Sequence, residues 1–251
     1  MSRHVKRPLA KSRASGDRPK GARPYWAIAL LAVLVSVDPA LAETVEVAPG
    51  VQVVKRTYSA PINEQPFFGF VVKNSTQLAA DENFVKAIIQ AAGTREKAFD
   101  ETSKRGWRAI TTGKVGEAAQ RFNQAFLLAP EQSGVYHGFA AVAQVRFNDS
   151  EFADELFKIA RRQANPLKTL NADHGRVLLI AKRPREAQPV LEQAVKDTPD
   201  FADAWTNLAW ARLQNGDRAA ACTAVAEAAK QRPSSNANID LVALRDSAQC
   251  K

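Results

Sequence analysis

The chain has 251 residues and a formal net charge of +9, and 45% of its residues are hydrophobic. The first 42 residues contribute a net charge of +6, so the remaining 209 residues carry only +3. A nucleic-acid partner inferred from net charge therefore loses most of its support. The length suits one compact domain or one short array of repeats.

The N-terminal segment has the order of a secretory signal peptide. Basic residues dominate 1–26, an apolar run of eleven residues covers Ala27–Val37, and Ala40-Leu41-Ala42 is a small-residue cleavage site. Eleven residues give about 16 Å of helix, too short for a hydrocarbon core of about 30 Å. We therefore predict a cleaved signal peptide over residues 1–42 and an exported, periplasmic protein without a stable membrane span; an uncleaved membrane anchor is the alternative.

Residues 43–74 are predicted to be an extended N-terminal segment. The stretches Thr44–Val47 and Val51–Tyr58 are rich in β-branched residues and flank a Pro-Gly turn. An apolar patch follows on an extended segment at Pro66–Val72. We expect it to cover the first helices; the alternative is that it lies in a groove or docks on another protein. Its aromatic residues are Phe67, Phe68 and Phe70.

Two further helices are predicted outside the central part of the chain. A leading helix covers residues 75–93, with Ser75-Thr76 as its N-cap, apolar residues at helical spacing and Gly93 at its end. A last helix lies within residues 235–251, with Asn236 as its N-cap. We expect one face of it to be buried: Ile239, Val242 and Ala243.

Residues 94–234 repeat one skeleton four times: an Ala, a large apolar residue four positions later, and a Pro eight or nine positions after that. The alanines lie 35, 34 and 34 residues apart. A fixed period of this length indicates stacked helix–turn–helix units. The four sets are Ala118, Phe122, Pro130; Ala153, Phe157, Pro166; Ala187, Leu191, Pro199; and Ala221, Val225, Pro233.

This pattern resembles the tetratricopeptide repeat family. The fourth repeat fits best, with Trp205, Leu208 and a turn glycine at Gly216, whereas the third is the most degenerate and the second carries at least one extra residue. Residues 121–128 also resemble short exported bacterial repeat proteins of unknown function. The resemblance implies an all-α solenoid of about four repeats that ends in a capping helix.

The resemblance also implies a groove on the first helices of the repeats, where a protein or peptide partner binds. Trp107 and Trp210 fall at the same register position and would flank this groove; the alternative is that both pack against neighbouring helices. Aromatic and Arg side chains are frequent anchors for bound peptides. The groove residues that the register selects are Lys104, Trp107, His137, Ala141, Asp173, Arg176, Asn207 and Trp210, together with Ser103, Gly138, Ala172 and Thr206.

Cys222 and Cys250 are the two cysteines of the chain. In an exported protein an even number of cysteines suggests a disulfide, which here would close a loop of about 29 residues. Two buried free thiols are the alternative.

The sequence offers little for catalysis. His137 and His174 lie in different repeats without a nearby Cys, so no zinc site is expected. A phosphate loop and a nucleophile motif are also missing from the sequence. We therefore expect no cofactor and no metal, and interpret the chain as a non-enzymatic interaction module of the bacterial cell envelope. A structural subunit of a larger envelope or secretion assembly is the alternative, and an enzyme is the less favoured one.

Overall fold

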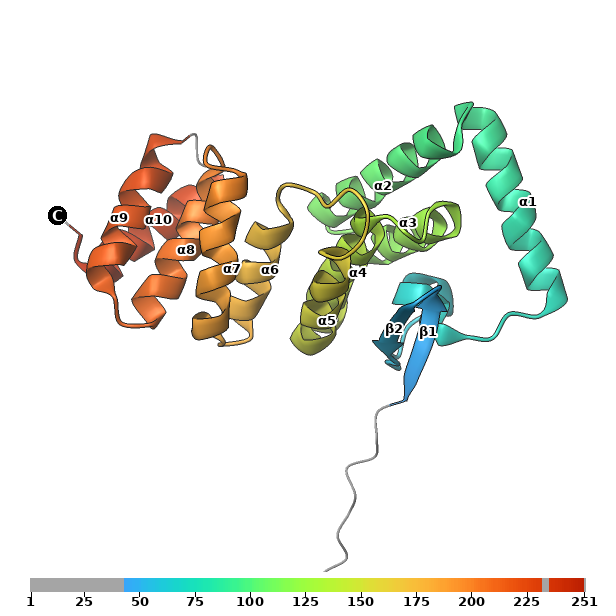
Figure 1. The fold of residues 1–251 in the computed structure, drawn as a ribbon, viewed down its shortest axis with the longest axis horizontal. Coiled ribbons are helices and arrows are strands. Elements are labelled where there is room, and N and C mark those ends of the chain that lie inside the picture. The colour runs from blue at the N-terminus through green and yellow to red at the C-terminus, as the bar shows by residue number, and fades with distance from the viewer. Residues whose placement is uncertain (1–42, 232–234, 251) are drawn as a thin grey trace, which may run out of the picture. The chain divides into compact units, whose positions relative to one another are not determined.

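The computed structural model describes residues 43–231 and 235–250. The predicted signal peptide and Pro233 of the fourth skeleton lie outside the described residues. Within those ranges a two-stranded antiparallel sheet and two short 3-10 helices precede ten α-helices (Figure 1). Their bounds are β1 Thr44–Ala48, β2 Val51–Val54, η1 Ile62–Glu64, η2 Pro66–Phe70, α1 Ser75–Ala92, α2 Arg95–Thr111, α3 Val115–Leu128, α4 Ser133–Phe147, α5 Ser150–Ala160, α6 Leu170–Ile180, α7 Pro184–Asp197, α8 Ala202–Gln214, α9 Arg218–Lys230 and α10 Ser235–Ala248.

From α2 onward the helices pack in consecutive pairs: α2 with α3, α4 with α5, α6 with α7, and α8 with α9 (Figure 1). The last helix, α10, packs against α8 and α9. The predicted all-α solenoid of about four repeats with a C-terminal capping helix is confirmed. The short sheet before it confirms the extended N-terminal segment.

Small residues on the first helix of a repeat make room for the large residue on the second helix. A Cβ on Gly106 of α2 would lie 2.8 Å from the ring of Phe122 of α3. A Cβ on Gly175 of α6 would overlap the side chain of Leu191 of α7. Phe122 and Leu191 are fully buried. In the first and third repeats the large apolar residue of the skeleton therefore packs directly against a glycine of the first helix.

The turn between the two helices of every repeat contains one residue with left-handed backbone. These residues are Gly113 (φ 73°), Asn148 (φ 51°), Lys182 (φ 59°) and Gly216 (φ 90°). Glycine adopts this conformation at little cost, whereas a residue with a side chain adopts it under strain. The third repeat, with Lys182 in place of glycine, therefore keeps the turn geometry of the first and fourth repeats.

One extra residue of the second repeat lies in this turn. In the first repeat the N–H of Lys114 donates to the carbonyl of Ala109, five residues back, at 2.8 Å. In the second repeat the N–H of Asp149 donates to the carbonyl of Ala143, six residues back, at 3.0 Å. This bond places one extra residue in the turn, in addition to the one that the late Pro166 indicates near the end of the repeat.

Three local predictions are wrong. Helix α1 is capped by Asn74, whose Oδ1 accepts from the N–H of Gln77, and not by Ser75 or Thr76. Pro66–Phe70 is a 3-10 turn with left-handed residues, not an extended segment. On α10, Ile239 and Val242 are 68% and 62% exposed. The buried face of α10 consists instead of Leu241, Leu244 and Ala248.

The core divides into two clusters, and α6 contributes to both. Leu170 and Val177 of α6 pack into the cluster that α3, α4 and α5 form. Ala172 and Leu178, on the other side of the same helix, pack into the cluster of α7, α8 and α9. The junction between the second and third repeats is therefore a boundary between two hydrophobic units.

Candidate functional site

A groove of about 630 Å³ lies beside α2 and contains the groove residues predicted for the first repeat. Ser103, Lys104 and Trp107 line it, and Phe99 from the turn before adds a second aromatic side chain. Residues four apart on a helix share a face, so these side chains form one stripe along α2. The other lining residues are Arg95, Glu96, Asp100, Ala129, Glu131, Gln132, Gly134, Asn165 and Leu167.

The facing wall of this groove comes from the α3–α4 connection and the start of α4, together with Asn165 and Leu167 of the α5–α6 connection. The sequence interpretation assigned neither connection to the groove. The N–H of Ala164 donates to the carbonyl of Glu131 at 3.1 Å, and the N–H of Ser133 donates to the carbonyl of Ala164 at 2.9 Å. The Asn165 amide nitrogen also donates to the Gln132 side chain at 3.1 Å. These bonds fix the α5–α6 connection against the start of α4. The late position of Pro166 was the available signal for this longer connection.

Trp107 connects the groove to the second and third repeats. Its ring lies edge-on to His137 of α4, with centroids 4.8 Å apart. His137 is 1% exposed, and its Nε2 donates to Oδ2 of Asp173 on α6 at 2.9 Å. Nδ1 of His137 is buried and has no hydrogen-bond partner among the described residues. Three of the predicted residues are thus brought together across three first helices.

The predicted residues of the third and fourth repeats lie apart from this groove. Arg176 is exposed and lines only a small hollow with Asn207 on α8. The Asn207 amide donates to the carbonyl of Ala172 at 3.4 Å. Trp210 packs partly buried against the C-terminal core cluster, which is the alternative considered for it. Ala141 on α4 is half-buried and does not line the groove beside α2.

A buried ionic cluster joins the second and third repeats, and the sequence had suggested no such role. Asp154 of α5 is 5% exposed and accepts from Lys158 at 3.0 Å, from Arg183 at 2.8 Å and from Nε2 of His174 at 2.8 Å. Arg161 donates to Nδ1 of His174 at 2.8 Å. An arginine can only donate, so His174 is neutral with its proton on Nε2.

The environment of this cluster lowers the pKa values of both His174 and Asp154. Burial lowers the pKa of His174 to about 4, and the neighbouring Arg161 adds to this effect against the raising influence of Asp154. Burial by itself raises the pKa of Asp154, but hydrogen bonds from His174, Lys158 and Arg183 outweigh burial and the net shift is downward. At neutral pH the cluster therefore contains an ionised Asp154 and a neutral His174.

The aromatic patch of the N-terminal segment packs against the chain itself. Phe67 is 6% exposed and lies among Phe126, Tyr136 and Phe139, with ring centroids 4.6–6.2 Å away. Phe67 is thus inside the core of the first repeats. Phe68 and Phe70 are half-buried. The patch therefore packs against helices of the first repeats, which is the first of the two roles considered for it.

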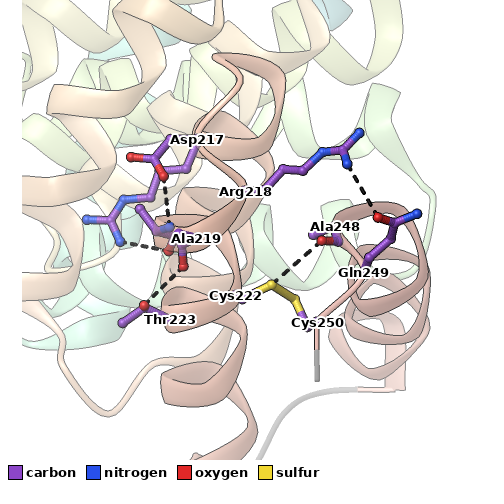
Figure 2. Close-up of a disulfide and its surroundings, with 10 residues drawn as sticks. Asp217, Arg218, Ala219, Cys222, Thr223, Ala248, Gln249 and Cys250 are labelled. Carbon is purple, nitrogen blue, oxygen red and sulfur yellow. Dashed lines mark hydrogen bonds between the residues drawn. A yellow bond between two sulfur atoms is a disulfide. The ribbon is translucent and has the colours of Figure 1, made fainter.

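Cys222 of α9 and Cys250 after α10 form a disulfide (Figure 2). Their Cα atoms lie 5.4 Å apart. The side chain of Arg218 also reaches Gln249 across the same two helices, at 3.4 Å. The disulfide therefore fastens the capping helix to the last repeat.

Residues 43–231 and 235–250 contain no group of His, Cys, Asp and Glu side chains that could hold a metal ion. In the same ranges no helix combines the length and apolar character needed to cross a membrane.

Comparison with protein families identifies the repeats. Residues 172–237 match the family model described as tetratricopeptide repeat. This part of the chain belongs to the tetratricopeptide repeat family. This family match covers the third and fourth repeats, and proteins of this kind bind other proteins. No functionally curated protein sequence matches the chain significantly.

Solved structures extend the tetratricopeptide fold to the larger part of the chain. The structure of pilF from Pseudomonas aeruginosa is 21% identical in sequence, with a TM-score of 0.54, and the match covers 62% of this chain and 71% of that chain. PilW, described as a widely conserved type IV pilus biogenesis factor, is 15% identical, with a TM-score of 0.50 over 70% and 88%. Yeast Tom70 is 19% identical, with a TM-score of 0.50 over 73% and 45%. At these identities the likeness concerns the fold.

Proposed function

We propose that this protein is a non-enzymatic interaction module of the bacterial cell envelope that binds a peptide or helix of a protein partner in the groove beside α2. One observation carries the proposal. The stripe of Phe99, Ser103, Lys104 and Trp107 on α2 lines a groove with a volume of about 630 Å³, whose opposite side includes the fixed α5–α6 connection. Apolar walls with a few polar groups are typical of ligand sites. Neither a cofactor nor a metal has a role in this proposal.

The dimensions of the groove suit a short segment. From Arg95 to Trp107 the helix rises about 18 Å, at about 1.5 Å per residue. This length matches about three turns of a partner helix or five to six extended residues. Phe99 and Trp107 lie about two helical turns apart and offer two contact points for apolar side chains, as in helix-in-groove recognition.

A charged group on the same wall supplies orientation. Ser103 Oγ is buried and has no hydrogen-bond partner among the described residues, so it offers no accessible polar contact to a bound segment. Lys104 is exposed at the rim and favours a partner with a carboxylate near this position. We therefore expect the bound segment to combine apolar residues with at least one acidic residue.

The compartment is part of the proposal. The predicted signal peptide over residues 1–42 directs the chain out of the cytoplasm, and the Cys222–Cys250 disulfide fits an oxidising compartment such as the periplasm. Cell fractionation and N-terminal sequencing test this part, with Glu43 expected as the first residue. A cytoplasmic chain that begins at Met1 contradicts it.

A second candidate function is that of a structural subunit of an envelope or secretion assembly. The exposed Ile239 and Val242 on the outer face of α10 favour it, because a terminal helix normally has a polar outer face. In that case a permanent contact would be made at the end of the solenoid and not in the groove.

Site-specific photo-crosslinking in cells tests the groove. A photoreactive amino acid is placed at Lys104, inside the groove, or at Arg105, the next residue, which lines a different surface of α2. The proposal expects one protein adduct from position 104 that is weak or missing from position 105. Equal adducts from both positions, or an adduct only from a residue on α10 such as Ile239, contradict groove binding.

A further inference from the structure

The N-terminal arm, residues 43–70, is held by the solenoid as a bound peptide would be. Asn123 of α3 is fully buried, and its Oδ1 accepts from the N–H of Phe68 at 3.1 Å. Its Nδ2 donates to the carbonyls of Asn63 at 3.1 Å and Gln65 at 2.8 Å. One buried amide thus pairs with three backbone groups of the arm, which is how a receptor fixes the register of an extended ligand.

Further contacts place the arm across α4 and α5 as well. The ring of Tyr58 stacks on Phe147 with centroids 3.8 Å apart, and its hydroxyl donates to Asp149 at 2.9 Å. Glu155 of α5 accepts from the N–H of Val54 at 2.7 Å. The arm is therefore recognised along most of its length by side chains of the first two repeats.

The arm has a backbone shape that it can keep only while it is held. Phe67, Phe68 and Phe70 have φ values of 54°, 53° and 59°, in the region that side chains disfavour. Such strain persists where surrounding contacts over-determine it. Burial of Phe67 and the Asn123 hydrogen bonds provide those contacts. The arm is thus a docking element whose conformation depends on its receptor.

The arm is joined to the solenoid by α1, which has few contacts of its own (Figure 1). No residue of this 18-residue helix is buried, whereas α2 has four buried residues. Leu78 is 51% exposed, and Val85 and Ile89 on the same stripe are only half-buried. Val72, in the connection before α1, is 94% exposed. Helix α1 therefore acts as a connector between two well-packed parts.

We infer that this arm is exchanged between two copies of the chain, each copy placing its residues 43–70 on α3, α4 and α5 of the other. Every arm contact described above is equally available in a second copy, because the receptor and the arm are identical in both. Exchange of an identical element is a low-cost route to a two-fold dimer. Only the sparse contacts of α1 change.

The dimer also accounts for the apolar stripe of α1. In a two-fold exchange the two connectors cross near the symmetry axis, where the stripe through Leu78, Val85 and Ile89 packs against its own copy. An amphipathic helix with no buried residue in one chain thereby gains a partner. The occupant of this face is the second copy, continuous with the arm interface.

The mass of the purified wild-type chain is the first test. Light scattering after chromatography should give twice the monomer mass at high protein concentration, with a monomer fraction that increases on dilution. A chain that stays monomeric at every concentration overturns the inference. This test needs no substitution and does not depend on how a variant folds.

Crosslinking then separates exchange from any other dimer. Glu64 of the arm forms an ion pair with Arg146 of α4, so Glu64→Cys on one tagged chain and Arg146→Cys on another report arm docking between copies. The native cysteines are already joined. After the two chains are refolded together, a short bismaleimide should give a crosslinked heterodimer. A Glu64→Cys/Arg146→Cys chain that crosslinks only within itself, with no heterodimer from the mixture, overturns the inference.

Discussion

Trp107 of α2 lies edge-on to the buried imidazole of His137 of α4, with the two ring centroids 4.8 Å apart. The same indole also packs edge-on against Phe122, 5.3 Å away. Trp107 thus belongs to the core of the first two repeats and to the wall of the groove. A substitution there should therefore change stability and, under the proposed function, binding as well.

Trp107→Ala should lower the free energy of unfolding by about 2–4 kcal/mol, because it removes a partly buried aromatic side chain and leaves a cavity. Lys104→Ala, one turn earlier in the groove and exposed, should change it by less than about 0.5 kcal/mol. Urea unfolding at pH 7 measures both. Equal stability of the Trp107 variant and the wild type would contradict the packing described.

Substitutions at the left-handed turn position should change the free energy of unfolding in opposite directions in different repeats. Lys182→Gly should stabilise by about 0.5–1 kcal/mol, since it relieves a residue held at φ 59°. Gly216→Ala should destabilise by about 1 kcal/mol, and a Cβ there meets no other atom within 4 Å, so the cost is that of the backbone alone. Denaturation midpoints of the two variants should move in opposite directions; a shift of both in the same direction rules out the turn assignment.

Stability should decrease in mild acid because of His174. In the unfolded chain its pKa is about 6.5, and burial lowers the folded value to about 4. Between these values the unfolded state binds more protons, so the free energy of unfolding falls as the pH falls through this window. The contribution is complete above pH 6.5, and its loss by pH 4 amounts to about 3 kcal/mol.

The lowered pKa of Asp154 has its effect at lower pH. Its folded pKa lies below the ordinary value, so the stability it contributes is lost as the pH falls through that folded pKa.

The variant His174→Gln tests the contribution of His174. Urea unfolding at several pH values between 7 and 4 should show that this variant loses most of the pH dependence of the free energy of unfolding above pH 4. If the variant keeps the wild-type slope, another group is responsible.

Removal of the disulfide should loosen the C-terminal end selectively. In the loop-entropy model a bridge closing about 29 residues contributes about 3–4 kcal/mol. Cys222→Ala/Cys250→Ala should therefore increase amide hydrogen exchange in α10 and the end of α9, with α3 and α4 protected as before. Mass spectrometry of the alkylated, unreduced wild type should find no free thiol; two alkylated cysteines would contradict the bridge.

The sequence predicted the repeat architecture because its packing is local and periodic. Gly106 with Phe122, and Gly175 with Leu191, are contacts within one repeat, so a fixed spacing in the sequence translates directly into contact in space. The disulfide pair was foreseeable in the same way, from cysteine number and compartment. Position in the register also identified Ser103, Lys104 and Trp107, which do share a groove.

Features that depend on contacts between repeats could not be read from the sequence. The Asp154 cluster combines side chains from α5, from α6 and from the turn before α7, and no local sequence pattern connects them. The left-handed turn through Phe67 exists because Asn123 and the aromatic core hold it. The buried face of α10 cannot be read from its sequence, because Ile239 and Leu241 are equally apolar and only the neighbouring helices decide which of them is buried.

Binding of a selected peptide to the groove tests the central claim most directly. Peptides of twelve residues are selected from a random display library on the purified protein, and their affinities are measured for the wild type, Lys104→Glu and the matched variant Arg105→Glu. We predict peptides that combine aromatic or aliphatic residues with an acidic residue, a loss of affinity of at least tenfold for Lys104→Glu, and less than a twofold change for Arg105→Glu. Equal losses for the two variants, or no change for either, would contradict binding in the groove beside α2.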